Sequence, residues 1–266
     1  MKCFTTILGA RGSVPVSGMP YSRYGGATTC VLLNFGGQFI ILDAGTGILS
    51  LPESAMRQPR LPLLLTHPHA DHILGLPMCP YVMKREAQLD IYAVSRGGCD
   101  TREQICRLMS PPVWPVLPEM LPAKICFHDL PDTMRLGEVS IRVTEGNHPG
   151  GASVFRLEAE GCSVVFATDC TLTEDITPSL AAFAQDCDLL LCDGQYTDAE
   201  YAGFAGYGHS TWSMAAQLAQ RCGAKQLRIV HHSPFRTDAE LEFAAKALRA
   251  IDPAFDFAKE GEEIEL

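Results

Sequence analysis

Residues 61–72 read Leu-Pro-Leu-Leu-Leu-Thr-His-Pro-His-Ala-Asp-His. An apolar run of strand length leads directly into three imidazoles and one carboxylate. These four side chains are His67, His69, Asp71 and His72. A soluble protein gains little stability from crowding such groups unless a cation lies among them. Imidazole nitrogen and carboxylate oxygen are the ligands of a divalent transition metal such as zinc. We therefore predict a metal site at the end of this strand rather than a polar loop that happens to be rich in histidine.

The length and composition are those of a globular α/β protein. The chain has 266 residues, of which 47% are apolar and 20% charged, and no low-complexity segment interrupts it. We expect a single domain over residues 1–266. The formal net charge is −10 and there is no run of Lys or Arg. A polyanion such as tRNA or duplex DNA would meet long-range repulsion, so we expect a small substrate and no nucleic-acid partner.

The cysteines and the apolar segments predict where the protein resides. There are 11 cysteines, an odd number, and none forms a CxxC pair. Several lie in apolar runs, as buried free thiols do, which is typical of a reducing cytosol. We predict a cytoplasmic protein. The apolar stretch Cys3–Ala10 is too short for a signal peptide or a membrane span, and no longer one follows, so no membrane partner is expected.

Short apolar, β-branched runs recur along the chain and predict strands. They are Phe39–Leu42, Leu61–Leu65, Leu89–Val94, Val139–Val143, Val154–Leu157, Cys162–Ala167, Cys187–Leu191 and Leu227–Val230. Helical spacing predicts a helix over Trp212–Cys222, with Ser210 or Thr211 as its N-cap. A second helix is predicted over Asp238–Ala250, preceded by a capping box that begins at Thr237. The proline-rich segment from Pro111 to Pro122 is interpreted as a surface loop and not as a linker between domains.

Polar residues follow the predicted strands at the point where each strand ends. They are Asp43, His67, His69, Asp169, Asp193 and His231, with His148 a few residues beyond its strand. In open α/β sheets, sites assemble at the carboxyl ends of strands. We therefore expect these side chains to share one edge. Of His231 and His232, only one is expected to point into the site, because side chains alternate along a strand.

Several motifs give the chain a family resemblance that runs from Arg11 to Pro234. Besides HxHxDH, the motifs are Arg11–Pro15, Tyr24–Thr28, Leu42–Gly47, Tyr207–Thr211 and His231–Pro234. Together they resemble the metallo-β-lactamase superfamily. HxHxDH by itself indicates only the superfamily, whereas the last two motifs resemble its phosphodiesterase branch. That branch includes phosphoribosyl cyclic phosphodiesterase and, more distantly, ribonuclease Z. The resemblance implies a mixed α/β fold, an αββα four-layer sandwich with its metal site at the strand-end rim.

The resemblance also implies a dinuclear metal site. His67, His69 and His148 would hold one ion; Asp71, His72 and His231 would hold the other. Asp169 would bridge them, and His209 would stand opposite as an imidazole that binds no metal. Asp71, Asp169 and His209 would be the catalytic residues. Asp43 and Asp193 would orient ligands, although Asp43 is equally compatible with a role in its turn. Zinc, manganese or iron(II) would suit the ligands. The family suggests a homodimer, and whether His232 has a role is left open.

The implied reaction is hydrolysis of a small phosphodiester of a ribose or nucleotide, with cyclic esters as candidates. Two ions about 3.5–4 Å apart would lower the pKa of a shared water. His209 would neutralise charge on phosphoryl oxygens or protonate the leaving oxygen. Arg11 and Ser13 are weaker candidates for contact with the substrate.

Other functions remain open at this stage. The same ligands serve hydrolases of carboxylic esters, thioesters and lactones. An RNA-processing endonuclease shares the motifs but not the charge, and a metal-binding scaffold would not need His209. An oxygen- or NO-reducing diiron protein would favour a carboxylate in place of His69. Ala70, Cys192 and Ser233 depart from residues common in relatives, and these departures leave the substrate open.

Overall fold

The computed structural model describes residues 2–266, and its backbone is built on two seven-stranded sheets. The first sheet has the strand order β14-β1-β2-β3-β4-β5-β6. Its strands are β1 (Cys3–Gly9), β2 (Cys30–Phe35), β3 (Gln38–Leu42), β4 (Arg60–Leu65), β5 (Gln88–Ala93), β6 (Lys124–Asp129) and β14 (Glu263–Glu265). Strands β3 to β6 run parallel to one another, whereas β14, β1, β2 and β3 pair antiparallel.

The second sheet has the order β13-β12-β11-β10-β9-β8-β7. Its strands are β7 (Thr133–Leu136), β8 (Val139–Gly146), β9 (Ala152–Ala159), β10 (Cys162–Ala167), β11 (Leu189–Asp193), β12 (Gln226–Val230) and β13 (Phe255–Phe257). Strands β10 to β13 are parallel, and β8, β9 and β10 alternate in direction. The carboxyl ends of β8, β10, β11 and β12 therefore lie on the same edge of the sheet.

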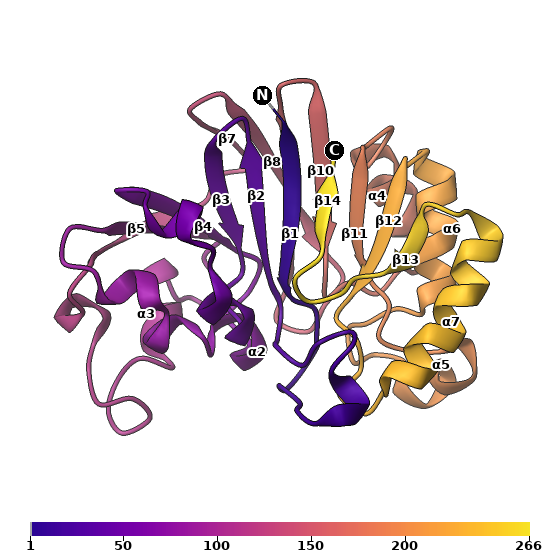
Figure 1. The fold of residues 1–266 in the computed structure, drawn as a ribbon, viewed down its shortest axis with the longest axis horizontal. Helices are drawn as coiled ribbons and strands as arrows, with labels where there is room; N and C mark the ends of the chain where they lie inside the picture. Colours follow the sequence, from indigo (N-terminus) through magenta and orange to yellow (C-terminus); the bar gives the residue numbers. More distant parts are fainter. Residues whose placement is uncertain (1) are drawn as a thin grey trace.

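Helices cover the outer faces of the two sheets (Figure 1). The helices of the described residues are α1 (Glu53–Met56), α2 (Ala70–Ile73), α3 (Thr101–Cys106), α4 (Thr177–Phe183), α5 (Asp198–Phe204), α6 (Trp212–Cys222) and α7 (Asp238–Ile251). Short 3-10 helices lie at Met19–Tyr21, Thr46–Ser50, Leu76–Met78, Pro80–Met83 and Pro118–Met120. None of the described helices is long and apolar enough to cross a membrane.

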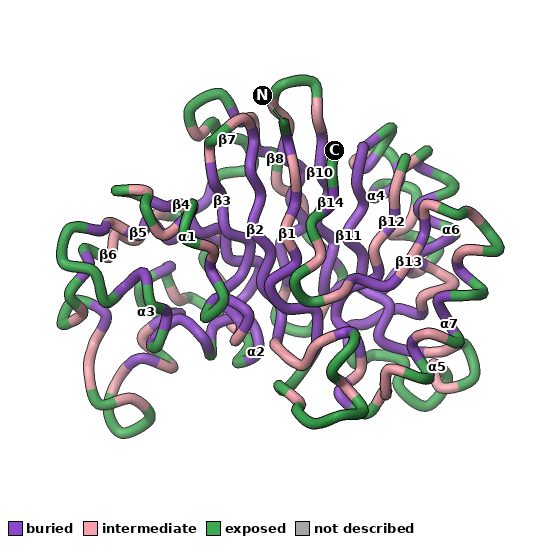
Figure 2. The backbone as a smooth tube through the Cα atoms, viewed as in Figure 1, coloured by how far each residue is buried: buried purple, intermediate pink, exposed green. Residues whose placement is uncertain are grey.

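Three buried apolar clusters lie between the layers of the molecule. One cluster lies between the sheets, because it contains Leu33 and Ile40 from the first sheet and Phe155 and Leu191 from the second. A second packs the outer face of the first sheet, and a third packs α4, α6 and α7 on the outer face of the second. The buried backbone runs through the central strands, with the exposed backbone at the periphery (Figure 2). This confirms the predicted αββα sandwich.

The two predicted helices are confirmed, with their caps. Helix α6 has the predicted bounds, Thr211 is its N-cap, and Gly223 ends it with φ 69° in the left-handed region. Helix α7 ends one residue later than predicted, at Ile251, and Thr237 with Glu240 forms its capping box. The eight predicted strands are also present. The largest differences in where a strand begins are at β9, which begins at Ala152 rather than Val154, and at β11, which begins at Leu189 rather than Cys187.

Candidate metal centre

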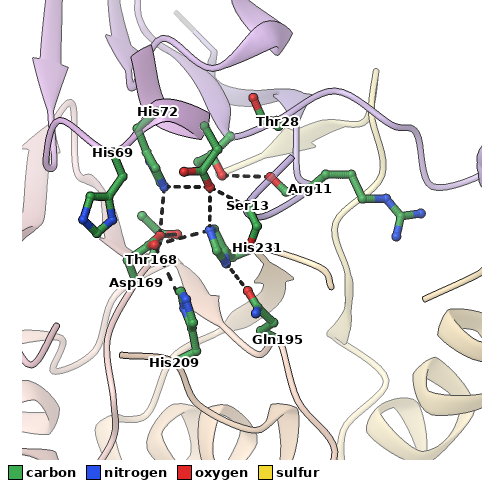
Figure 3. Close-up of polar contacts among 12 residues, drawn as sticks. Arg11, Ser13, Thr28, His69, His72, Thr168, Asp169, Gln195, His209 and His231 are labelled. Atoms are coloured by element: carbon green, nitrogen blue, oxygen red, sulfur yellow. Dashed lines mark hydrogen bonds and ion pairs between the residues drawn. The ribbon is translucent and has the colours of Figure 1, made fainter. Parts of the chain in front are cut away.

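The predicted site residues converge where the carboxyl ends of the strands of both sheets meet. His67 and His69 follow β4, and Asp71 and His72 lie in α2 just beyond. His148, Asp169 and His231 follow β8, β10 and β12 of the other sheet. Figure 3 shows His69, His72, His209 and His231 converging around Asp169. The site therefore lies at the seam between the two sheets, and both contribute to it.

Among the described residues, five groups of three potential ligands are close enough to hold a cation, and two of the five match the expected ligand sets. In the first, the ring nitrogens of His67, His69 and His148 lie within 4.8 Å of one another. His148 Nε2 is 3.1 Å from His69 Nδ1. In the second, one donor atom from each of Asp71, His72 and His231 lies within 4.8 Å of the others, and all three residues are buried. These are the two ligand sets that the resemblance implies.

Asp169 lies between the two groups. Its Oδ2 is 3.1 Å from His72 Nε2, and its Oδ1 is 3.3 Å from His231 Nε2. The same Oδ1 is 3.7 Å from His67 Nε2 and 3.9 Å from His148 Nε2. One carboxylate thus faces nitrogens of both groups, which is the arrangement that a ligand shared by two cations requires.

Buried ring nitrogens without a hydrogen-bond partner indicate whether these residues fit metal ions. His67 Nε2 and His72 Nε2 are buried without a hydrogen-bond partner. A buried polar atom with no partner is costly, and a metal ion is one contact that can compensate a ring nitrogen. The opposite ring nitrogens are engaged: His67 Nδ1 with Thr66 Oγ1 at 3.0 Å and His72 Nδ1 with Asp43 Oδ2 at 2.7 Å. The donor set and its orphaned nitrogens therefore fit divalent metal ions.

The pKa values differ between the two groups. Burial lowers the pKa of His67, His69 and His148, so these imidazoles are neutral and offer lone pairs at neutral pH. Burial also acts to lower the pKa of His231, but the carboxylates of Asp169 and Asp71 outweigh it and raise that pKa to about 9. The pKa of His72 is raised well above its ordinary value by the same balance. The second group thus attracts positive charge.

Residues outside the two groups hold the imidazoles in orientation. Asp43 engages His72, as expected, and also accepts hydrogen bonds from Thr66 N and Oγ1. Gln195 Oε1 lies 2.7 Å from His231 Nδ1, a role that sequence reasoning missed. The carbonyl of Gly208 lies 2.9 Å from His148 Nδ1 and was missed as well. A ring held through its second nitrogen keeps the first aimed at the centre.

Asp193 engages His209 rather than one of the expected metal ligands. Its Oδ2 lies 2.8 Å from His209 Nδ1, and its Oδ1 accepts from Ser210 N at 2.9 Å. Its nearest approach to an expected ligand is 3.8 Å, to His231 Nδ1. Asp193 therefore orients His209, which stacks on His231 with ring centroids 4.6 Å apart.

Three of the site residues have a left-handed backbone. Asp43, Asp169 and His231 have φ of 59°, 51° and 61°, and each follows the end of a strand. This region is costly for residues other than glycine and is adopted where the surroundings impose it. The reversal turns each side chain off its strand and into the seam.

Arg11 does not contact the site, so its predicted contact with the substrate is wrong. The side chain is buried, and its guanidinium points away from the cluster (Figure 3). It donates to the carbonyls of Gly25, Ser233 and Arg236, and so ties distant loops together. Ser13 does reach the site, through a backbone N–H that donates to Asp71 Oδ2 at 2.7 Å. His232 is buried, and its Nε2 lies 2.9 Å from the Ile229 carbonyl.

Gly208 offers a test of how the His148 loop is held. A Cβ built at Gly208 would lie 2.2 Å from His148 Nδ1. We expect Gly208→Ala to displace His148 and to lower metal content per chain, measured by elemental analysis. Gly206→Ala is the matched control, because both glycines have φ of 93° but nothing lies within 4 Å of a Cβ at Gly206. Equal metal content in the two variants would contradict the assignment.

Comparison with known proteins relates this geometry to a family. The model of the beta-lactamase superfamily domain matches residues 39–232. Ribonuclease Z from Treponema denticola is 26% identical over 306 residues, which cover 98% of this chain and 97% of the relative. The metallo-beta-lactamase fold protein YhfI from Bacillus subtilis has a TM-score of 0.73 at 20% identity, over 100% of both chains. A diphosphatase from the PhnP family has a TM-score of 0.71 at 20% identity, over 100% of this chain and 98% of its own.

The solved structures, at 20% identity, show a shared fold. This fold implies divalent metal ions, in agreement with the clusters of His and Asp at the seam. The family model covers most of the chain, including the residues from Asp43 to His231 that converge there. The chain therefore belongs to the metallo-β-lactamase superfamily of hydrolases.

Proposed function

We propose that the protein is a dinuclear metal-dependent phosphodiesterase that acts on a small phosphodiester of a ribose or nucleotide, cyclic esters included. One observation carries the proposal: Asp169 lies between two groups of potential ligands, and a further imidazole, His209, is held beside them by its own carboxylate. A diphosphatase of the PhnP family with the same fold and relatives named ribonuclease Z support chemistry at phosphorus.

The proposal assigns ligand roles to seven residues. His67, His69 and His148 would hold one ion, Asp71, His72 and His231 the other, and Asp169 would contact both. When bound, such ions supply Lewis acidity and a water whose pKa approaches neutrality. Zinc, manganese or iron(II) would each suit these donors.

The chain's own residues supply orientation and a proton. Asp43, Thr66 and Gln195 fix three of the imidazoles through their outer nitrogens. The Nδ1 of His209 faces Asp193, which leaves its Nε2 to face a substrate. We assign His209 Nε2 to protonate the leaving oxygen or to donate a hydrogen bond to a phosphoryl oxygen. Asp71 is held by the Ser13 N–H.

We also propose that residues 1–266 form one domain that works in the cytoplasm. The buried cluster shared by the two sheets supports the first part. The cysteines support the second, because all of them are free thiols, as a reducing compartment requires. The homodimer suggested by the family resemblance stays a prediction.

A panel of substrates tests the proposed function. The purified protein, reconstituted with zinc or manganese, is assayed with bis(p-nitrophenyl) phosphate, cyclic nucleotides, phosphoribosyl cyclic phosphate and a thioester. We expect cleavage of phosphodiesters that stops on treatment with a chelator and returns with added metal. Thioester cleavage without phosphodiester cleavage would instead assign the protein to the ester hydrolases.

A second candidate, RNA processing, is favoured by the ribonuclease Z relatives, which match nearly the whole chain. The net charge of −10 argues against a large polyanion as substrate. Cleavage of a tRNA precursor at its 3′ side, with steeply salt-dependent binding, would establish this function in place of the first. Small phosphodiesters cleaved while precursor tRNA stays intact would exclude it.

A further inference from the structure

A pocket of about 510 Å³ opens beside the metal centre. Its wall comes from three segments, residues 13–14, 195–207 and 233–240. Cavities of this size typically hold small ligands. The segments that form it include Tyr207, two residues before His209, and Ser233, two residues after His231. The pocket and the centre are therefore built from the same stretches of chain.

Three contacts join the pocket wall directly to the candidate site. The Ser13 N–H donates to Asp71 Oδ2, and Gln195 Oε1 engages His231 Nδ1. The ring of Tyr196 lies edge-on to that of His209, with centroids 6.0 Å apart. A molecule whose phosphate lay at the seam would therefore have its remainder next to this wall.

The wall is aromatic. Phe204 stacks on Tyr196 with centroids 5.0 Å apart and an interplanar angle of 11°, and Tyr207 meets Phe204 edge-on at 5.9 Å. Phe235 lines the same pocket from the third segment. Phe204, Tyr207 and Phe235 are 43%, 64% and 87% exposed. Exposed rings gathered at one cavity, rather than scattered singly, mark a binding surface.

The charged groups of the pocket are already paired. Among the described residues that line it, Arg236 is the cationic one, and its guanidinium pairs with Glu200. Glu200 and Glu240 each accept hydrogen bonds from the threonine at the start of a helix. The pocket therefore offers no free cation for a second phosphate, and its exposed rings favour a planar, uncharged group.

We propose that this pocket binds the nucleobase of the substrate, so that the enzyme acts on nucleotide phosphodiesters in preference to sugar phosphodiesters without a base. The inference rests on the proposed function, because it places the phosphodiester at the seam. Tyr207 and Phe235 are then residues that determine specificity: the base stacks on these rings while the phosphate faces His209. Stacking of this kind tolerates different bases, since each base has a π-face.

A matched pair of substrates tests the proposal. Adenosine 2′,3′-cyclic phosphate is compared with methyl riboside 2′,3′-cyclic phosphate, in which a methoxy group replaces the base. We expect kcat/KM to favour the nucleotide by about tenfold or more, since loss of one base–aromatic stack costs roughly fivefold to a hundredfold. Tyr207→Ala and Phe235→Ala should each reduce this ratio by about tenfold, and Tyr207→Phe should preserve it.

Phe243→Ala is the control, because Phe243 is 80% exposed but lies on α7 outside this pocket. It should leave the ratio unchanged. Equal kcat/KM for the two substrates in the parent protein would overturn the proposal. A preference that neither alanine variant alters would overturn it too. The proposal would also be overturned if the parent protein were a dimer by size-exclusion chromatography and the alanine variants dissociated it without changing the ratio of kcat/KM.

Calorimetric titration separates this proposal from the proposed function. The probes are adenosine 5′-monophosphate and ribose 5-phosphate, added to the metal-loaded protein. Tighter binding of the nucleotide that Tyr207→Ala removes, in a protein that cleaves no phosphodiester, would support the base pocket and refute the phosphodiesterase. Cleavage of both cyclic substrates with equal efficiency would support the phosphodiesterase and refute the pocket.

Discussion

Replacing Asp169 by alanine is expected to remove both metal ions and to lower turnover by about three orders of magnitude, the scale of losing a preorganised charge at a catalytic centre. The reason is its position: one carboxylate faces His72 and His231 on one side and His67 and His148 on the other. Without it, each group of three would lose the one carboxylate that faces both groups. Metal per chain, measured by elemental analysis, and phosphodiester turnover are the two measurements.

The control for this variant must be an aspartate that has the same left-handed backbone conformation. Asp186 has φ of 54°, close to the 51° of Asp169, but it is exposed. Asp186→Ala therefore carries the same left-handed cost, about 1–2 kcal/mol, without touching the centre. It should keep its metal and its activity. An Asp169→Ala protein that is fully active without metal would refute the assignment, and one that keeps both ions would show that Asp169 is not shared.

Replacing His209 by alanine is expected to leave the metal in place and to lower kcat by about 10²–10⁴, the usual contribution of a general acid. Its Nδ1 is engaged by Asp193, and the ring lies against His231 and His148 at centroid distances of 4.6 and 5.2 Å. The geometry also groups His209 with potential ligands, so metal content is the decisive measurement. Loss of an ion in this variant would make His209 a ligand.

The leaving group distinguishes a proton donor from a merely structural residue. A p-nitrophenolate leaves without a proton, whereas a ribose alkoxide needs one. His209→Ala should therefore slow the cleavage of a cyclic nucleotide far more than that of bis(p-nitrophenyl) phosphate. His128→Ala is the matched control, because that imidazole stacks on Tyr92 and bonds to Asp90, away from the centre. Equal losses for both substrates would contradict proton donation.

The parts of the fold that the sequence predicts are those with a strong local pattern. Strand β10 has the predicted bounds, and α6 begins and ends where its cap residues indicate. The short strands β13 and β14 have three residues each and little pattern of their own. They exist because they pair with β12 and β1, which are distant in sequence. Such strands are stabilised by their partners and cannot be inferred from local periodicity.

The same limit applies to the site. The HxHxDH motif and the polar residues at strand ends carry a local signal, and the structure brings them together. Gln195 carries none: it engages His231 across 36 positions in the chain, and an amide after a strand is ordinary. The prediction for Arg11 was wrong because its motif resembles that of the family, while its guanidinium bonds to carbonyls up to 225 positions away. In both cases, hydrogen bonds between residues far apart in the sequence determine where the side chain lies.

The division of the candidate ligands between two sheets has a consequence for biosynthesis. Synthesis proceeds from the N-terminus, and domains fold as the chain emerges. The segment that carries His67 to His72 is made early, whereas His231 is the last of the seven to be translated. A nascent or truncated polypeptide therefore holds only a fraction of the donors. Hydrolytic capacity would arise only after the second sheet has closed onto the first, so an unfinished chain would be inert.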